Sequence, residues 1–432
     1  MNPISNNFAI VFYIFLWICI LYYYIRRDKR VSLGLSLIML YTVQAIVALI
    51  VLNSEFSDYN NVVLSLWPFV YLIFMLYLSM KPILDLKERE LHAIEIPNSQ
   101  INTSMCVFFA FFSIISIYNI LPDIQYGFTQ MLVSDSEGIM DLYLDSTEAK
   151  KAHTSFSGVF SLQGVISNMS NYITPLLFFT YYVKKNKSNV VMVLLLIALL
   201  QGPLTGIANA SRQQLIGQIF AFFLLYFFFS PYMTHSSKNT FKRVGLIFVS
   251  ILFMIFIIIT IARSSQKSYQ GNSLYNIESY FAQGPINFSG FCLDANGTRE
   301  GNRIAPLFLQ IMGRKVLSPE QIKTKYSYMR IDSSSFSTYV GDIVLDFGPY
   351  LAVVFFVVMT FVFSRMLKHK RRLSYGQVII VFILVKICSG YYQFGFGGVG
   401  GNLAFIMLLT MSIIFLQKNN INNCPEIITR QS

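Results

Sequence analysis

Residues 244–262 read VGLIFVSILFMIFIIITIA, with Arg243 directly before them and Arg263 directly after. An apolar run of this length, without a single ionisable side chain, is typical of a helix that crosses a lipid bilayer. Such a run is expected to be helical, because lipid offers the backbone no hydrogen-bond partners. The whole chain has the same character, since 54% of its 432 residues are hydrophobic and only 12% are charged. That charged fraction is about half the value typical of a soluble domain. The sequence therefore predicts a membrane protein.

Further apolar runs of similar length lie on both sides of this one. Together they predict an all-α polytopic membrane protein with about eleven transmembrane helices, forming a single membrane domain over residues 1–432. The predicted spans are 8–25, 31–52, 62–80, 103–121, 164–183, 189–208, 213–230, 244–262, 348–364, 374–393 and 402–417.

Positive charge is distributed unevenly among the polar connections between these spans. Alternate connections, beginning with 26–30 and ending with the tail from residue 418, hold 20 Lys and Arg residues. The opposite set, without its one long member, holds three, namely Lys150, Lys151 and Arg212. Basic residues close to spans stay in the cytoplasm. We therefore expect the N-terminus outside and the C-terminus in the cytoplasm.

Two long connections fall on the outer side. Residues 122–163 form the first, which is acidic, and residues 263–347 form the second, which holds nine Lys and Arg residues and many aromatic side chains. Connections of this length usually carry function or are disordered, and long loops cross the membrane largely regardless of charge. Because the two loops have opposite charge, either they dock on one another or they stand as independent solvated loops. Cys292 is the only cysteine of the second loop, so no disulfide is expected there.

Two arginines are expected at the outer rim of the helices. Arg212 stands in a very short turn between two spans, and Arg263 ends the run that was quoted first. A guanidinium held at this rim can bind two phosphate oxygens at once. Each residue can equally be an interfacial anchor whose charge reaches the headgroups.

The second outer loop offers further charged candidates. Arg299, Arg303 and Arg330 belong to a basic cluster, and such a cluster is usually a solvated face. One or two of its members near the membrane would neutralise a diphosphate. Asp342 and Asp346 stand four residues apart just before a span, so they share one face if that stretch is helical. We expect them either to pair with cations or to take a proton from a sugar hydroxyl.

Two residues of other kinds complete the candidates. Lys386 interrupts the apolar run 374–393 and is the clearest ionisable residue inside a span. It is a functional candidate unless its charge reaches the outer face. Tyr339 is one of many aromatic residues of the second loop, which either stack on sugar rings or form an interfacial belt. No Cys and His residues have the spacing of a zinc site, and no cofactor is expected.

Three short motifs give the chain a resemblance to a known family. They are Asn209-Ala-Ser-Arg-Gln-Gln214 opening an aromatic-rich span, Ile261-Ala-Arg263 opening the long outer loop, and Gly341-x4-Asp-Phe-Gly348 leading into the next span. The spacing Arg330-x10-Gly341 also resembles a motif of some members. Over nearly its whole length the chain resembles the bacterial O-antigen (oligosaccharide repeat unit) polymerases of the Wzy type. These enzymes resemble the membrane-embedded glycosyltransferases of the C type (GT-C).

The resemblance implies a metal-independent glycosyltransferase at the outer face of the bacterial inner membrane. Its substrate would be an undecaprenyl-pyrophosphate-linked oligosaccharide, and its product O-antigen of lipopolysaccharide or a related surface polysaccharide. The expected partners are the chain-length regulator, the flippase and the ligase of the same pathway. The catalytic residues would be Arg212, Arg263, Arg330 and Asp342, and the substrate-binding residues would be Arg303, Arg299, Lys386 and Tyr339.

Other classes of membrane protein share part of this pattern. A flippase for the same lipid-linked sugar would carry charged residues deep in several spans and would have short outer loops. Here only Lys386 lies well inside a predicted span. A polysaccharide ligase has a similar build, and the sequence separates it poorly from a polymerase. A membrane O-acyltransferase is disfavoured, because none of the four histidines lies in a predicted span.

Overall fold

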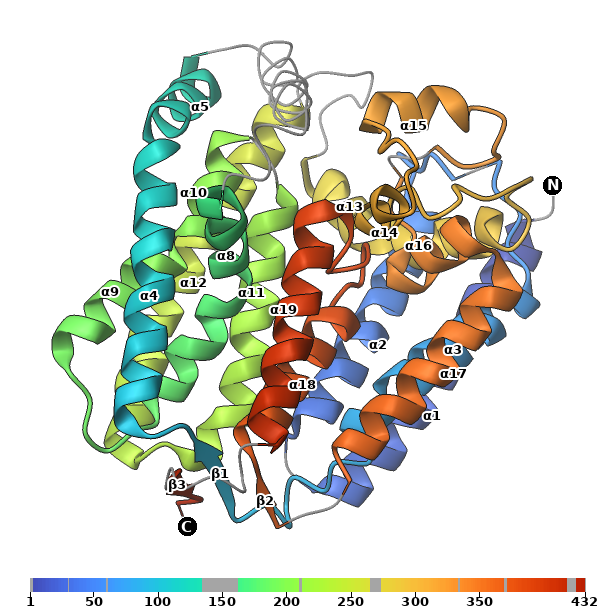
Figure 1. Ribbon diagram of the computed structural model, residues 1–432. Coiled ribbons are helices and arrows are strands. Elements are labelled where there is room, and N and C mark those ends of the chain that lie inside the picture. Colours follow the sequence, from blue (N-terminus) through green and yellow to red (C-terminus); the bar gives the residue numbers. More distant parts are fainter. Residues whose placement is uncertain are drawn as a thin grey trace. The chain divides into compact units, whose positions relative to one another are not determined.

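The computed structural model describes residues 3–29, 31–59, 61–133, 162–209, 212–264, 273–332, 335–368, 371–417 and 425–431. Most of the regular structure in these ranges is helical (Figure 1). The chain divides into two compact units, which are described in turn. The first unit comprises Met1–Arg89, Leu274–His369 and Ile383–Phe405, and the second comprises Glu90–Ser273, Lys370–Phe382 and Ile406–Ser432.

The first unit is built on long apolar helices. These are α1 (Pro3–Asp28), α2 (Leu33–Leu52), α3 (Leu66–Leu84) and α17 (Pro349–Met366), with the last turns of α18 (Tyr375–Cys388) and the first turns of α19 (Gly398–Gln417). The hydroxyl of Tyr71 on α3 donates to the carbonyl of Pro349 at 2.6 Å. Further along, the hydroxyl of Thr360 on α17 donates to the carbonyl of Leu78 at 2.8 Å. Helices α3 and α17 therefore run parallel to each other.

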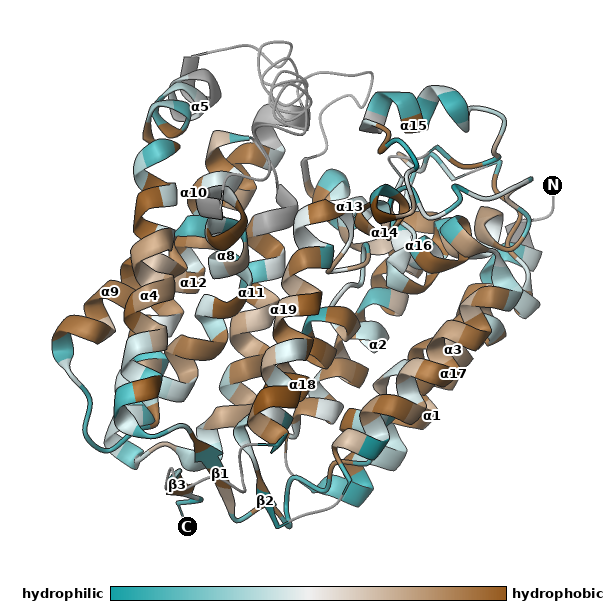
Figure 2. Ribbon diagram, in the orientation of Figure 1, coloured by the Kyte–Doolittle hydropathy of each residue, from teal (hydrophilic) through white to brown (hydrophobic). Residues whose placement is uncertain are grey.

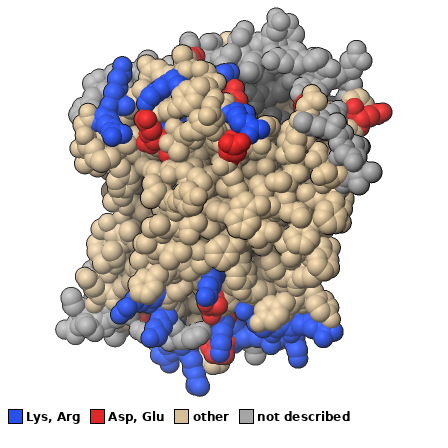
Figure 3. All heavy atoms as spheres, turned by 90° about the vertical axis from the view of Figure 1, so that its right-hand side faces the viewer, with Lys and Arg blue, Asp and Glu red and all other residues tan. Residues whose placement is uncertain are grey.

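The basic ends of these helices lie at the same end of the unit. Arg27 Nη2, in the last turn of α1, donates to the carbonyl of Leu84 in the last turn of α3 at 2.9 Å. Arg365 lies in the last turn of α17, which the parallel packing brings to the same end. On the face drawn in Figure 3, charged side chains gather at the two ends and other residues form the wide band between them. Figure 2 shows hydrophobic residues dominating the lengths of these helices, as expected where lipid surrounds them.

Within the predicted second outer loop, residues 273–332 and 335–347 form a folded segment at the opposite end of α17. It contains α13 (Ser273–Asn287), the π-helical turn η2 (Phe288–Cys292), α14 (Pro306–Ile311), α15 (Pro319–Lys325) and α16 (Thr338–Phe347). Helix α16 passes into α17 through Gly348, whose φ of 83° and ψ of 163° are backbone angles reserved for glycine. Pro349 then takes the first helical position, where its missing N–H costs nothing.

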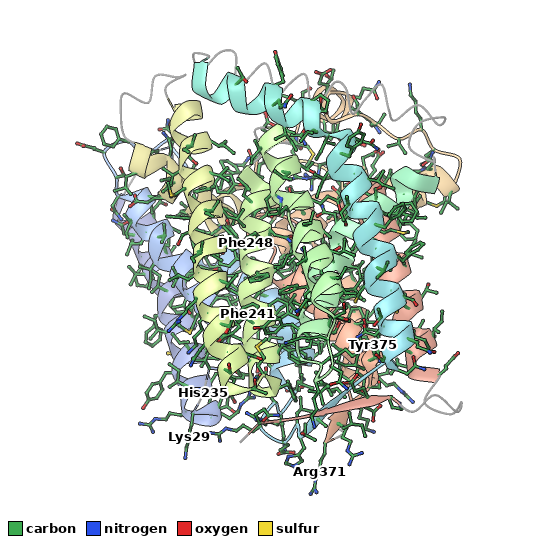
Figure 4. All side chains as sticks on the ribbon, turned by 90° about the vertical axis from the view of Figure 1, so that its left-hand side faces the viewer. Lys29, His235, Phe241, Phe248, Arg371 and Tyr375 are labelled. Atoms are coloured by element: carbon green, nitrogen blue, oxygen red, sulfur yellow. The ribbon has the colours of Figure 1, made fainter. Side chains whose placement is uncertain are left out.

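The second unit packs its helices around aromatic side chains. Its helices are α4 (Ser99–Asn119), α5 (Leu121–Val133), α8 (Leu162–Tyr182), α9 (Asn189–Leu199), α10 (Gln201–Ala208), α11 (Arg212–Phe229) and α12 (His235–Ser264), with the short η1 (Ser230–Tyr232). The ring centroids of Phe178 on α8 and Phe222 on α11 lie 5.9 Å apart, and those of Phe222 and Phe241 on α12 lie 5.3 Å apart. Figure 4 shows Phe241 and Phe248 along α12. Such ring pairs add to the free energy of packing, so they hold these three helices together.

A small sheet in the second unit was not predicted. Strands β1 (Ala93–Ile96), β2 (Arg372–Leu373) and β3 (Glu426–Thr429) have the order β2-β1-β3. Ala93 stands opposite Arg372 in the parallel pair and opposite Thr429 in the antiparallel pair. The buried Lys184 reinforces the sheet, since its Nζ lies 3.5 Å from Glu426 Oε2. The all-α prediction was therefore incomplete, because strands of two to four residues are too short to show an alternating pattern.

All three strands come from connections that were predicted to be cytoplasmic. Their pairing puts these connections on one side of the second unit, as the alternation of the predicted spans requires. Of the predicted first outer loop, residues 122–133 belong to α5, residues 162–163 belong to α8, and residues 134–161 lie outside the described residues. Docking of the first loop on the second therefore remains a prediction.

Nine of the predicted spans are helices long and apolar enough to cross a membrane, when the described residues alone are considered. The remaining two, at 164–183 and 374–393, correspond to α8 and α18, which are helical but do not belong to these nine. Helix α18 ends at Cys388 because the chain turns at Gly390, whose N–H donates to the carbonyl of Ile387 at 3.0 Å. A helical polytopic membrane protein is thus confirmed, and the number of eleven spans remains a prediction.

Candidate functional site

An arginine and two carboxylates form a buried ionic cluster in the first unit. Arg299 donates through Nε to Asp346 Oδ1 at 2.6 Å and through Nη2 to Asp342 Oδ1 at 3.2 Å. The same Nη2 donates to the backbone carbonyl of Asp342 at 3.0 Å. All three residues are only 1% exposed. The prediction that Asp342 and Asp346 share one helical face is confirmed, since α16 presents both carboxylates to one guanidinium.

The geometry of this cluster favours an ion pair between Arg299 and Asp346. Burial lowers the pKa of Arg299, but Asp346 and Asp342 outweigh burial and leave that pKa above its ordinary value. Burial raises the pKa of Asp346, and the charge of Arg299 opposes that rise. The raised pKa of Arg299 favours the ion pair, whereas the raised pKa of Asp346 opposes it. The hydrogen bonds that the Asp346 carboxylate accepts decide in favour of the ion pair. Asp346 Oδ2 accepts from the backbone N–H groups of Arg303 at 3.0 Å and Ile304 at 2.7 Å, and three N–H donors stabilise a carboxylate.

Arg303 borders this cluster and reaches the surface. Its backbone N–H donates to Asp346, and its carbonyl accepts from the N–H of Gly398 at 3.0 Å. Its guanidinium lies 3.4 Å from Asp342 Oδ1 and donates through Nη2 to Gln393 Oε1 at 3.1 Å. The side chain of Arg303 is nevertheless 21% exposed. Backbone and side chain are thus both held in place before a ligand arrives, which is what an anion-binding cation requires.

The turn between α18 and α19 closes against Arg303. A Cβ added at Gly397 would lie 3.2 Å from the carbonyl oxygen of Arg303, so a side chain there would crowd it. Asn402, in the first turns of α19, donates to the carbonyls of Ile304 at 2.7 Å and Phe396 at 2.8 Å. These contacts fix Arg303 beside the start of a helix that is long and apolar enough to span a membrane.

The other predicted residues of the first unit lie apart from this cluster or inside the core. Arg330 forms an ion pair with Asp294, and their side chains are 49% and 81% exposed. Tyr339 is completely buried, and its hydroxyl forms a hydrogen bond with Ser79. It therefore packs in the core and offers no face to a sugar ring. Lys386 is half-buried on α18.

The side chains of Arg212 and Arg263 lie outside the described residues. The backbone places Arg212 at the first position of α11 and Arg263 in the last turn of α12. Their meeting at a common rim remains a prediction.

Gln393 and Asn402 were missed by sequence reasoning. Both are amide side chains beside the glycine-rich stretch 395–401, within an otherwise apolar region. A polar amide at the edge of an apolar run, next to a turn that needs backbone partners, is the signal that could have found them. Their partners stand about 90 residues earlier in the chain, a separation that no local pattern reveals.

The fold and this cluster define a helical polytopic membrane protein with a structured segment, described over residues 274–332 and 335–347, that presents a fixed arginine beside a helix long and apolar enough to span a membrane. Comparisons with protein-family models, curated proteins and solved structures give no match.

Proposed function

We propose that this protein polymerises undecaprenyl-pyrophosphate-linked oligosaccharide repeat units into O-antigen or a related surface polysaccharide. The transfer takes place at the outer face of the bacterial inner membrane. The observation that carries the proposal is Arg303, a guanidinium held by Asp342 and Gln393 at the start of α19 and still 21% exposed. A fixed cation at the membrane boundary suits a substrate that carries its phosphates at the junction of lipid and sugar.

The reaction needs such a cation. A hydroxyl of the acceptor unit attacks the anomeric carbon of the sugar that joins the growing chain to its carrier. The bond from that carbon to the phosphate oxygen breaks, and undecaprenyl pyrophosphate leaves with the bonding electrons. Negative charge therefore develops on the carrier, and a prepositioned guanidinium stabilises it most in the transition state. In the proposal Arg303 supplies this charge, and Arg212 and Arg263 add to it.

The acceptor hydroxyl must also lose its proton. Asp342 is 1% exposed, and its Oδ2 accepts from the N–H of Phe394 at 2.9 Å while its Oδ1 faces Arg299 and Arg303. These contacts favour the prediction that Asp342 pairs with cations over the prediction that it takes a proton. The proposal assigns proton acceptance to one of two other carboxylates of the same loop, Glu278, which is half-buried on α13, or the exposed Asp294.

Polymerisation by the purified protein tests the proposal directly. Incubated with a defined undecaprenyl-pyrophosphate-linked repeat unit, the wild-type protein should give a ladder of lengthening products. Arg303→Ala should give none. Lys323→Ala is the matched control, since it removes the positive charge of an exposed ion pair, in which Lys323 Nζ lies 3.6 Å from Asp332 Oδ2. This variant should leave the ladder unchanged. A normal ladder from Arg303→Ala would remove this residue from the mechanism.

Surface polysaccharide in cells separates the proposal from its alternatives. Loss of the protein should leave a surface capped with a single repeat unit. Loss of all surface sugar would favour a flippase or a ligase instead. Arg212→Ala and Arg263→Ala should each abolish the polymer while the protein is still made at its usual level, and normal ladders from both variants would contradict the role given to them.

A further inference from the structure

Helix α14 is apolar on both of its sides, and only one side is covered. Leu307 and Leu309 are 5% and 6% exposed and pack into the first unit. Phe308, Ile311 and the adjoining Met312 are 44%, 72% and 66% exposed. A helix that is apolar all round is normally buried all round. We therefore expect the exposed side of α14, which is the bare side, to lie in an apolar environment.

Two cations directly follow the exposed residues Phe308, Ile311 and Met312, which we call the apolar tip. The N–H of Gly313 donates to the carbonyl of Gln310 at 3.0 Å, and the N–H of Arg314 donates to that of Leu309 at 2.9 Å. With Gly313 at a φ of 77°, these bonds form the Schellman motif that ends many helices. The residue after the glycine usually packs back on the helix through an apolar side chain. Here that position is the exposed Arg314, and the exposed Lys315 follows it.

Helix α14 is fixed at the level where a spanning helix begins. The N–H of Leu307 donates to Asn402 Oδ1 at 3.3 Å, and Asn402 also holds the carbonyl of Ile304. Asn402 comes four residues after the start of α19, which is about 6 Å along a helix. The start of α14 therefore lies within about one helical turn of the point where α19 begins.

We propose that α14 inserts its bare side into the lipid interface at this end of the helices, and that Arg314 and Lys315 bind anionic phospholipid headgroups. Apolar residues flanked by basic ones are the composition of interfacial anchors, which combine apolar burial with attraction to anionic lipid. The proposal stands on the apolar tip, the adjoining charges and the depth set by Asn402. It does not depend on the proposed enzymatic function.

Site-directed labelling of the full-length protein in lipid nanodiscs tests this proposal. Cys19 and Cys424 are first replaced by Ser, because Cys19 is exposed and Cys424 lies outside the described residues, whereas Cys106, Cys292 and Cys388 are buried. An environment-sensitive fluorophore is then attached to Ile311→Cys. The matched control is Lys323→Cys on α15, where the side chain is 66% exposed in the same unit.

Two quenchers distinguish lipid from water. The probe at position 311 should be quenched by nitroxide on lipid acyl chains and protected from aqueous iodide, and the probe at position 323 should show the reverse. Iodide quenching at position 311 equal to that at 323 would overturn the proposal. Protection of position 311 from both quenchers would also overturn it, because a protein surface, such as a second copy of this chain, would then cover the tip.

The headgroup preference is measured with the same probe. Nitroxide-labelled phosphatidylglycerol should quench position 311 more strongly than nitroxide-labelled phosphatidylcholine, with each basic residue adding up to about fivefold to the local enrichment. The double variant Arg314→Gln with Lys315→Gln should lose this preference. Equal quenching by the two lipids in the protein with both basic residues would refute the role of anionic headgroups.

Discussion

Arg299 places a buried guanidinium between two buried carboxylates, and the partly exposed Arg303 supplies the second positive charge beside Asp342, so the removal of Arg299 should be costly. Arg299→Gln leaves Asp342 and Asp346 without their buried cation, and we expect the free energy of unfolding to fall by about 3–5 kcal/mol. Lys323→Gln opens an exposed ion pair with Asp332 and should cost less than about 1 kcal/mol. Thermal unfolding in detergent compares the two variants. Equal unfolding temperatures would mean that the cluster does not hold the chain around Arg299 to α16.

Glu300 should make the free energy of unfolding depend weakly on pH. Lys325 and Tyr326 donate to Glu300 Oε2 at 2.9 and 3.1 Å, and these hydrogen bonds hold the pKa of that carboxyl below its ordinary value. A lowered pKa in the folded protein adds stability above the unfolded pKa of about 4.3, and this stability is lost as the pH falls through the folded value. Because the side chain of Glu300 is 51% exposed, the effect should stay below about 1 kcal/mol.

Unfolding of the wild type and of Glu300→Gln at a series of pH values measures this contribution. The wild type should be slightly more stable at neutral pH, and the two curves should converge in acid. A difference in stability that grows as the pH falls would show that folding raises, and does not lower, the pKa of Glu300.

Among the elements, the long helices were predictable and the short ones were not. An apolar run of transmembrane length, such as 244–262, leaves the chain no alternative to a helix in lipid. The predicted span 374–393 ran past the true end of α18 because Tyr391 and Tyr392 extend the apolar pattern beyond Gly390. Strand β2 has only two residues, and its pairing with β1 depends on a partner far away in the chain.

The junction between α16 and α17 depends on one glycine. Gly348→Ala places a Cβ on a backbone with φ 83° and ψ 163°, and we expect a loss of about 1–3 kcal/mol in the free energy of unfolding. The added methyl group itself meets only Thr298 at 3.7 Å, so the cost comes from the backbone. Gly245→Ala, inside α12, is the matched control and should be neutral or stabilising by up to about 1 kcal/mol. Equal effects of the two substitutions on thermal unfolding would contradict this account.

At the scale of the whole molecule, the sequence predicted the membrane character but not the site. The spacing of Asp342 and Asp346 follows from the helical period, so their common face could be foreseen. Their cation could not, because Arg299 stands 43 and 47 residues earlier and competes with other basic residues of the same segment. Only the packing of residues 299–304 against α16 selects Arg299 for burial and leaves Arg303 partly exposed.

The predicted membrane orientation can be tested within the first unit alone. Lys323 belongs to the segment that precedes α17, and the exposed Lys368 follows the end of α17. Basic residues at helix ends stay in the cytoplasm, so we expect the end of α17 inside and the segment before α17 outside. Lys323→Cys should therefore react with a membrane-impermeant maleimide applied to cells whose outer membrane alone has been opened. Lys368→Cys should react only after the inner membrane is permeabilised as well. Cys19 and Cys424 are replaced by Ser as in the fluorophore experiment. Cys292 needs no replacement, because it is buried and burial raises the pKa of its thiol to about 12, which keeps it protonated and unreactive. Labelling with the opposite order would place the segment in the cytoplasm, away from any undecaprenyl-linked sugar on the outer face, and the proposed polymerase would lose its substrate.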